Sequence, residues 1–196
     1  MPTSTTPTSY QPPAYPRGHL LAGVGVLLAQ LGTGIAVYPH LPEEIPRHFS
    51  ASGAVTLTAT TPLSAFGPVL IYAALLALFA AATRLVLHTL PRDHPDAPPP
   101  LRDGKLNRPA TRADAARGAI ALMATAWIVG LVFALASAGV WFPGAVGYAP
   151  WFLPVLLVLL AATLIPSGVA LYARWRERRD GSSGVDSGTS DGGERL

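Results

Sequence analysis

The sequence GAIALMATAWIVGLVFALASAGV, from Gly118 to Val140, contains no charged residue. A helix that crosses a membrane needs about 20 mostly apolar residues in a row, and this stretch is long enough. The absence of charge continues as far as Arg174, which leaves room for a second crossing over Trp151–Ala173. Aromatic residues, prolines and glycines fill the short interval between them, as is typical of a turn at the membrane interface. We therefore predict a transmembrane helical hairpin over residues 118–173.

Two further intervals meet the same criterion, Gly18–Tyr38 and Phe66–Leu87. Arg84 lies near the end of the second interval, where its long side chain can reach the headgroups and act as an anchor. No small-residue cleavage site follows the first interval, so we expect a retained helix and not a signal peptide. Pro166 predicts a kink in the last span. With 13% charged residues, against about 25% in soluble domains, the chain is expected to be all-α, an integral membrane four-helix bundle.

The distribution of basic residues predicts how the bundle is oriented. Lys and Arg gather between the second and third spans and just after the fourth, whereas the loop after the first span has only Arg47, opposed by Glu43 and Glu44. Short loops rich in Lys and Arg stay on the cytoplasmic side. We therefore expect a multi-pass protein of the bacterial cell membrane with both termini in the cytoplasm.

Proline content and charge divide the chain into five parts. These are a disordered cytoplasmic N-terminal tail (1–17), a membrane domain of two helices with an outer loop at 39–65 (18–90), a Pro-rich basic cytoplasmic linker (91–117), the helical hairpin (118–173), and a basic flank with a disordered cytoplasmic tail (174–196). The tails lack apolar periodicity, so they cannot bury enough surface to offset the entropy lost on ordering.

The outer loop is rich in proline and is predicted to be stiff. Residues before proline avoid the α region, so Leu41 and Ile45 should be extended, while Pro42 and Pro46 fix their own φ angles. Beyond the loop's glycine, residues 55–60 alternate apolar and Thr side chains, which favours an extended segment. We expect an extended Pro-rich extracytoplasmic loop between the first two helices.

The loop carries a recognisable motif, L-P-x-x-I-P-x-H-F-x-x-x-G. Its residues are Leu41, Pro42, Ile45, Pro46, His48, Phe49 and Gly53. The motif and its place after a first transmembrane helix resemble the small bacterial membrane domain of unknown function at the N-terminus of SdpI-like immunity proteins. The resemblance covers roughly residues 20–90 and departs from the family at Ala54-Val55. It implies a membrane protein linked to toxin-peptide immunity and signalling, with no assigned chemistry.

His40, Glu44 and His48 repeat every fourth residue, which on a helix would place three potential zinc ligands on one face. Pro46 argues against that helix, so we favour a structural role for His48 and expect neither a metal site nor a cofactor. A third reading, recognition of an extracytoplasmic peptide or a lipid by the stiff loop, stays open.

Two stripes of small residues suggest close helix packing, either within the bundle or between two copies in a homodimer. They are Gly25, Ala29, Gly32 and Ala36 on the first span and Ala126, Gly130, Ala134 and Ala138 on the third. We favour packing within the bundle. The basic run Arg174–Arg179 could bind anionic membrane lipid, although a topology signal explains it equally well.

The charge distribution and the motifs of the sequence narrow the classes of function that we expect. The basic residues flank apolar spans and form no patch typical of nucleic-acid binding, and no catalytic motif is present, so we expect no nucleic-acid partner and no enzyme. The chain also has no cysteine. The first hypothesis is an immunity, sensing or interaction protein whose outer loop meets an extracytoplasmic peptide or another membrane protein. The second is a small transporter or a transporter accessory subunit.

Overall fold

The computed structural model describes residues 10–49, 55–97, 108–144 and 150–182. In chain order its elements are α1 (Arg17–Val37), the 3-10 turn η1 (Tyr38–His40), β1 (Glu44–Phe49), β2 (Val55–Ala59), α2 (Pro62–His88), α3 (Arg112–Trp141), α4 (Phe152–Ala162) and α5 (Ile165–Ser182). Within these residues four helical segments are long and apolar enough to cross a membrane. The fold class predicted from the sequence is confirmed, and the chain is a multi-pass membrane protein with one small β-hairpin added.

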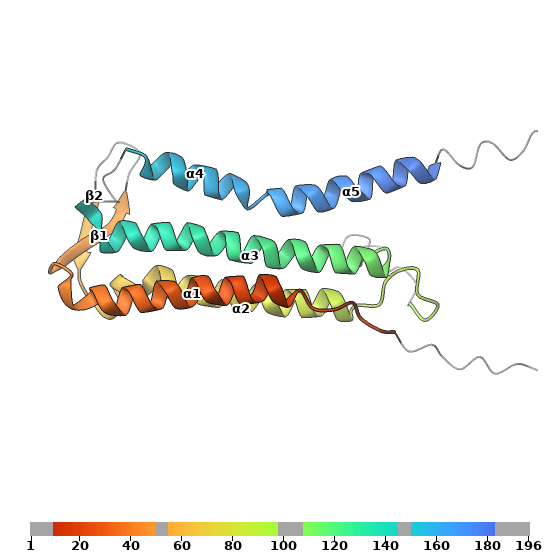
Figure 1. The fold of residues 1–196 in the computed structure, drawn as a ribbon, viewed down its shortest axis with the longest axis horizontal. Helices are drawn as coiled ribbons and strands as arrows, with labels where there is room; N and C mark the ends of the chain where they lie inside the picture. Colours follow the sequence, from red (N-terminus) through yellow and green to blue (C-terminus); the bar gives the residue numbers. More distant parts are fainter. Residues whose placement is uncertain (1–9, 50–54, 98–107, 145–149, 183–196) are drawn as a thin grey trace, which may run out of the picture.

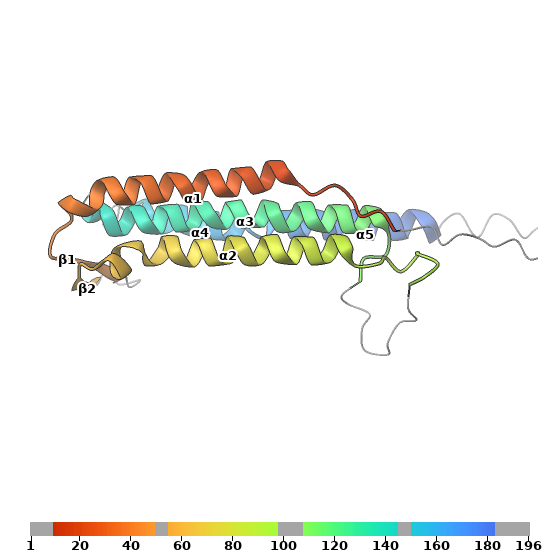
Figure 2. The ribbon, with the colours of Figure 1, turned by 90° about the horizontal axis from the view of Figure 1, so that it is seen from below.

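Helix α3 lies at the centre of the bundle (Figure 1). Helices α1 and α2 pack on it from one side, whereas α4 and α5 run along its other side and have their main contacts with α3 alone. Figure 2 shows α1 and α2 flanking α3. We call the end that carries β1 and β2 the hairpin end, and the opposite end, where Arg17 begins α1 and His88 ends α2, the basic end.

Two helices begin earlier than hydrophobicity predicted. Helix α2 starts at Pro62, where the Thr61 hydroxyl accepts from the Ser64 N–H at 3.1 Å and the Ser64 hydroxyl accepts from the Thr61 N–H at 2.8 Å. Helix α3 starts at Arg112, capped by Thr111. Capping satisfies N–H groups that a helix start leaves free, and it does not depend on apolar character. The outer loop and the linker are therefore shorter than 39–65 and 91–117.

The fourth span is broken. Helix α4 ends at Ala162 and α5 begins at Ile165, just before the proline that predicted a kink, Pro166. The Thr125 hydroxyl of α3 donates to the Thr163 carbonyl at the break, at 3.4 Å. A neighbouring helix thus satisfies a backbone group at the break, as such interruptions require in lipid. Beyond Ala173, the predicted end of the span, α5 continues as a helix through the basic flank to Ser182.

The prediction of a disordered N-terminal tail was wrong for residues 10–16. The Tyr10 hydroxyl donates to the Leu87 carbonyl at 3.1 Å, and the Tyr15 hydroxyl lies 3.2 Å from the Met123 sulfur. Arg112 donates from Nε to the Gln11 carbonyl at 3.0 Å. These polar contacts dock the segment, together with packing of Tyr15 against a buried apolar cluster that contains Tyr72 and Met123. Residues 1–9 and 183–196 lie outside the described part of the chain.

One polar connection crosses the interior between α1 and α3. Gln30 is 4% exposed, donates from Nε2 to the Gly130 carbonyl at 3.2 Å and accepts from the Ser137 hydroxyl at 3.4 Å. A buried amide is costly unless it is hydrogen-bonded, and here both ends of it are. Large apolar side chains such as Leu28, Leu78 and Leu157 are exposed on the outside of the helices, where they would face lipid.

Candidate functional site

The loop predicted to be extended is a two-stranded antiparallel hairpin. Strand β1 pairs with β2 so that Pro46 lies opposite Leu57 and His48 opposite Thr56, which leaves Arg47 as an extra residue in an irregularity of β1. A bulge of this kind suits a strand containing proline, since proline has no N–H for the ladder. The extended conformation predicted for residues 55–59 is confirmed, with the addition that the segment pairs with β1.

Hydrogen bonds tie the hairpin to the start of α2. The Thr60 N–H donates to the Glu43 carbonyl at 2.8 Å, and the Thr60 hydroxyl donates to the Pro42 carbonyl at 2.5 Å. The Ser64 hydroxyl, which also caps α2, donates to the Ala59 carbonyl at 2.9 Å. The same few residues therefore close the base of the hairpin and begin the helix, so the hairpin and α2 are joined without a flexible linker.

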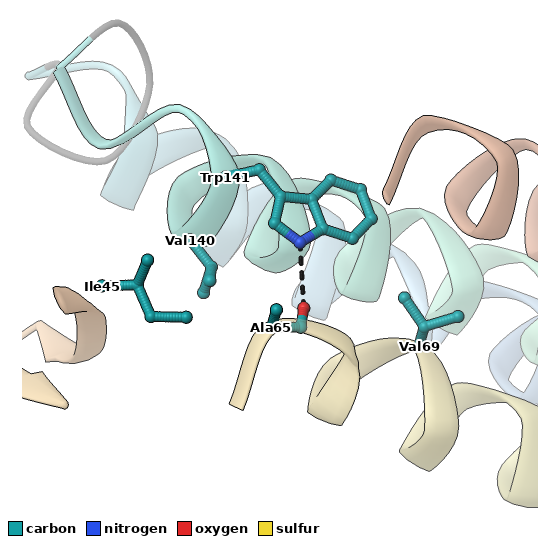
Figure 3. Close-up of a cluster of buried hydrophobic side chains, with 5 residues drawn as sticks. All are labelled: Ile45, Ala65, Val69, Val140 and Trp141. Carbon is teal, nitrogen blue, oxygen red and sulfur yellow. Dashed lines mark hydrogen bonds between the residues drawn. The ribbon is translucent and has the colours of Figure 1, made fainter. Parts of the chain in front are cut away.

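An apolar cluster seats the hairpin on the helix ends (Figure 3). Ile45 is fully buried among Ala65, Val69, Val140 and Trp141. The Trp141 indole N–H donates to the Ala65 carbonyl at 2.9 Å, which links the end of α3 to the first turns of α2. An apolar side chain of this size contributes about 1.5–3 kcal/mol when fully buried.

The same indole also packs closely on α1. A Cβ at Gly34 would lie 2.7 Å from Cε1 of Phe66 and 2.8 Å from Cζ2 of Trp141. Only glycine lets the rings approach the helix this closely. The cluster therefore holds α1, α2, α3 and the hairpin together at one point.

The motif residues that the structure describes have structural roles. Leu41 packs against the apolar cluster, the Pro42 carbonyl accepts a hydrogen bond, and Ile45 and Pro46 are buried. The backbone of His48 and Phe49 lies in β1, whereas their side chains, and all of Gly53, fall outside the described part.

The described charged residues at the hairpin lie on its outside. Glu43, Glu44 and Arg47 are all exposed. His40 lies in η1 and Glu44 in β1, so they do not share a helix face. Within the described residues no three His, Cys, Asp or Glu side chains gather as metal ligands.

A groove that the sequence did not reveal lies between the hairpin, α2 and α3. It has a volume of 540 Å³; Pro46, Arg47 and Thr58 line it from the hairpin, and Leu63, Ile71 and Phe133 from the helices. Its polar lining residues come from the hairpin and the start of α2, whereas the residues farther along α2 and α3 that line it are apolar. Gly67 also lines it, with open space where a Cβ would lie. A glycine one turn after a capped helix start was the available signal, but a single glycine does not distinguish a groove from close packing.

The two stripes of small residues have different environments. On α3, Ala126 and Gly130 are buried, and a Cβ at Gly130 would collide with the Tyr72 ring, so this stripe packs within the bundle. On α1, Gly25 and Gly32 have nothing within 4 Å of a Cβ, and Ala29 is exposed as well. The prediction that this stripe packs within the bundle is therefore wrong for α1. This helix packs instead through Gly23, Gln30 and Gly34. A homodimer through the α1 stripe stays a prediction.

Comparison with protein-family models gives a match over part of the chain. No curated protein and no solved structure matches the chain. The matched residues, 25–73, begin in α1, include η1 and the hairpin, and end in the first half of α2. They contain the whole motif and omit α3, α4 and α5. The family they match is described as Domain of unknown function (DUF1648), which agrees with the resemblance seen in the sequence.

Proposed function

We propose that this chain is a non-enzymatic multi-pass protein of the bacterial cell membrane, of SdpI-like type, that acts in immunity, sensing or interaction through its hairpin end. The observation that carries the proposal is the rigid seating of the hairpin, with Ile45 fully buried beneath it and a groove beside it. A loop with no binding role has no need of this fixed geometry, whereas recognition benefits from a preorganised surface.

The orientation in this proposal follows from charge. The basic end carries Arg17, Arg84, Arg112 and Arg117, whereas the hairpin end carries Arg47 beside two glutamates. Because Lys and Arg near span ends favour the cytoplasm, the hairpin end faces outward and both termini face inward.

The groove at the hairpin end suits an amphipathic peptide from outside the cell. Arg47 and Thr58 offer polar contacts at the level of the hairpin, and Ile71 and Phe133 offer an apolar surface below them. A peptide lying at the membrane surface presents the same order of groups, polar above and apolar below. Its acidic or carbonyl groups would meet the exposed guanidinium of Arg47.

The test is resistance to membrane-active peptides. Bacteria expressing the chain are exposed to a panel of secreted amphipathic peptides, and growth is compared for wild type, Arg47→Ala and Ile71→Glu. The control is Leu57→Ala, which alters an exposed residue of the same hairpin outside the groove. We expect wild type and the control to protect against at least one peptide and both groove variants to lose protection at unchanged membrane abundance.

Other results of that experiment would contradict the proposal. If Arg47→Ala and Ile71→Glu protect as well as wild type, or if no peptide is resisted, recognition does not occur in this groove. If they act only by lowering membrane abundance, the hairpin has a structural role. Pro46 is a poor site for this test because it is buried, so its replacement would disturb the fold.

A second candidate, a small transporter or a transporter accessory subunit, is favoured by the broken fourth span. Interrupted helices near the middle of the membrane form substrate sites in several transporters. Here the Thr163 carbonyl at the break is held by Thr125. Transport predicts that Thr125→Val changes solute flux in proteoliposomes, whereas the first proposal predicts no flux and no change in peptide resistance.

A further inference from the structure

A second groove, at the basic end, is walled by the docked N-terminal segment, α1 and α2. Its volume is 840 Å³, within the range of sites that hold small molecules. Ala77, Ala80 and Ala81 form its α2 wall, and their short side chains leave the space open. Pro12 and Pro13 line it from the N-terminal segment. The hydroxyl of Tyr15 contributes to holding this segment in place, since it donates to the Ala80 carbonyl at 3.4 Å.

The charge in this groove has one sign. Arg17 and Arg84 supply it, and no Asp or Glu is among the described residues that line the groove. Within the described residues neither arginine forms an ion pair, although Arg117 of the same end pairs with Asp114 at 3.0 Å.

The depth of Arg84 gives this charge a physical consequence. Arg84 lies four residues before the end of α2, or about 6 Å along the helix axis. A guanidinium at that level is near the boundary of the hydrocarbon, where a cation is costly unless an anion or water accompanies it. Among the described residues, the lining of the groove supplies no anion, which leaves a place for an anion from outside the chain.

We propose that this groove binds one anionic phospholipid from the adjacent leaflet. The phosphate lies between Arg17 and Arg84, and one acyl chain follows the apolar wall past Ala81 to Ala77. Leu21 also lines the groove and is 69% exposed, so it adds apolar surface for the acyl chain. A free phosphate would leave this apolar wall uncovered, whereas a phospholipid satisfies the charge and the wall together.

The inference is tested by native mass spectrometry of the purified full chain in detergent. Phosphatidylglycerol or phosphatidylcholine is added, and lipid retention is compared for wild type and Arg17→Gln/Arg84→Gln. The control, Arg47→Gln/Arg92→Gln, removes the same charge outside this groove. We expect phosphatidylglycerol binding to fall about fivefold per groove arginine, about 25-fold for the pair, since each basic side chain near an anionic headgroup contributes about 1 kcal/mol. The control should change it less than about twofold.

Two more variants separate charge from shape and from misfolding. Arg84→Lys keeps the charge and should retain most phosphatidylglycerol binding. Ala81→Phe keeps both arginines but fills the groove at an exposed position, and it should weaken binding as much as the double substitution. If Ala81→Phe binds like wild type, the lipid does not lie in the groove and the inference is overturned.

The remaining outcomes also decide the matter. Equal binding by wild type and the groove double variant would overturn the inference, and so would an equal loss in the control, which would indicate general attraction to charge. Displacement of the lipid by inorganic phosphate alone would show a site for free anions instead. Equal retention of phosphatidylcholine and phosphatidylglycerol by wild type would show that the arginines do not select the headgroup.

Discussion

The two ends of the bundle each hold a groove, yet they are built in different ways. At the hairpin end, Ile45 and Trp141 fill the space between three helices, and a hairpin closes the end. At the basic end, the described residues form no hairpin, and a short segment lies over the helices. Its Tyr10 hydroxyl donates to the Leu87 carbonyl, and its Gln11 carbonyl accepts from Arg112. Aromatic packing makes one end rigid, whereas tyrosine and arginine contacts leave the other more adjustable. A fixed surface suits recognition. An adjustable one suits lipid where Arg17 and Arg84 form no ion pair within the described residues.

The largest expected effect comes from placing a charge beneath the hairpin. Ile45→Asp puts a carboxylate at a fully buried site without a partner and should lower the free energy of unfolding by at least about 3 kcal/mol. Leu57→Asp, on the opposite strand and 51% exposed, should change it by less than about 0.5 kcal/mol. Thermal unfolding in detergent measures both, together with trypsin cleavage after Arg47. Equal stability of the two variants would show that the hairpin is not anchored by Ile45.

The next effect compares glycines at the two ends of α1. Gly34→Ala pushes a methyl group against two rigid rings and should cost about 2 kcal/mol. Gly23→Ala meets the Cδ1 atom of Leu76 at 2.8 Å, but that methyl group lies at the end of a flexible side chain, so the cost should be smaller. Thermal unfolding of both variants checks the order.

Gly32→Ala is the matched control for these substitutions, since open space surrounds its Cβ position, and it should be neutral in a monomer. Chemical crosslinking of the chain in membranes, without disulfides, then tests whether two copies associate through this face of α1. If Gly32→Leu abolishes a crosslinked dimer that wild type forms, the exposed small-residue face of α1 is a homodimer interface. If no dimer forms in wild type, the predicted interface is wrong.

A smaller difference should separate two hydrogen bonds. Trp141→Phe keeps a ring in the cluster and loses the 2.9 Å bond to Ala65, which should cost about 1 kcal/mol. Tyr15→Phe loses a longer bond of 3.4 Å to Ala80 and a 3.2 Å contact with the Met123 sulfur, a weak acceptor, and should cost less. Denaturation by an unfolding detergent gives both values. A larger loss for Tyr15→Phe would reverse the proposed contrast between a rigid and an adjustable end.

The smallest effect is an alkaline sensitivity confined to the basic end. Burial raises the pKa of Tyr15 above 10.0, opposed by the Arg84 guanidinium, and burial also raises the pKa of Tyr10. The undocked segment therefore loses its hydroxyl protons first as the pH rises. Docking is fully stable below pH 10 and weakens as the pH passes through the higher pKa of the docked state. The measurement is the tyrosinate absorbance of the wild type, from which the absorbance of the Tyr10→Phe/Tyr15→Phe variant is subtracted. The difference should show titration above pH 10. A difference that titrates at or below pH 10 would contradict docking.

The sequence predicted the spans well because their signal is length and hydrophobicity, which any stretch such as Gly118–Val140 carries by itself. It did not predict which face of α1 is buried. Small residues occur on both faces, at Gly23 and Gly34 as well as Gly25 and Gly32, and an almost wholly apolar helix has no polar face to mark its outside.

The hairpin and the N-terminal contact were beyond sequence reasoning for another reason. Residues 55–59 show the alternation of a strand, yet whether they pair with β1 depends on the seating of Ile45, a contact between separate segments. Tyr10 and Tyr15 dock a segment of low hydrophobicity through hydrogen bonds that composition does not reveal. The sequence singled out the loop that forms the hairpin, and its role as a site stays a prediction. The groove beside it is formed by the hairpin, α2 and α3 together, so no single stretch of sequence reveals it.

The central claim is that the fixed hairpin end faces outward and the basic end faces the cytoplasm. Because the chain has no cysteine, Glu43→Cys and Asp93→Cys each introduce one exposed thiol, the first before β1 and the second after α2. A membrane-impermeant thiol reagent applied to intact cells should label Glu43→Cys, and it should label Asp93→Cys only after permeabilisation. Labelling of Asp93→Cys in intact cells, with Glu43→Cys protected until permeabilisation, would contradict the orientation and place the hairpin groove out of reach of any external peptide.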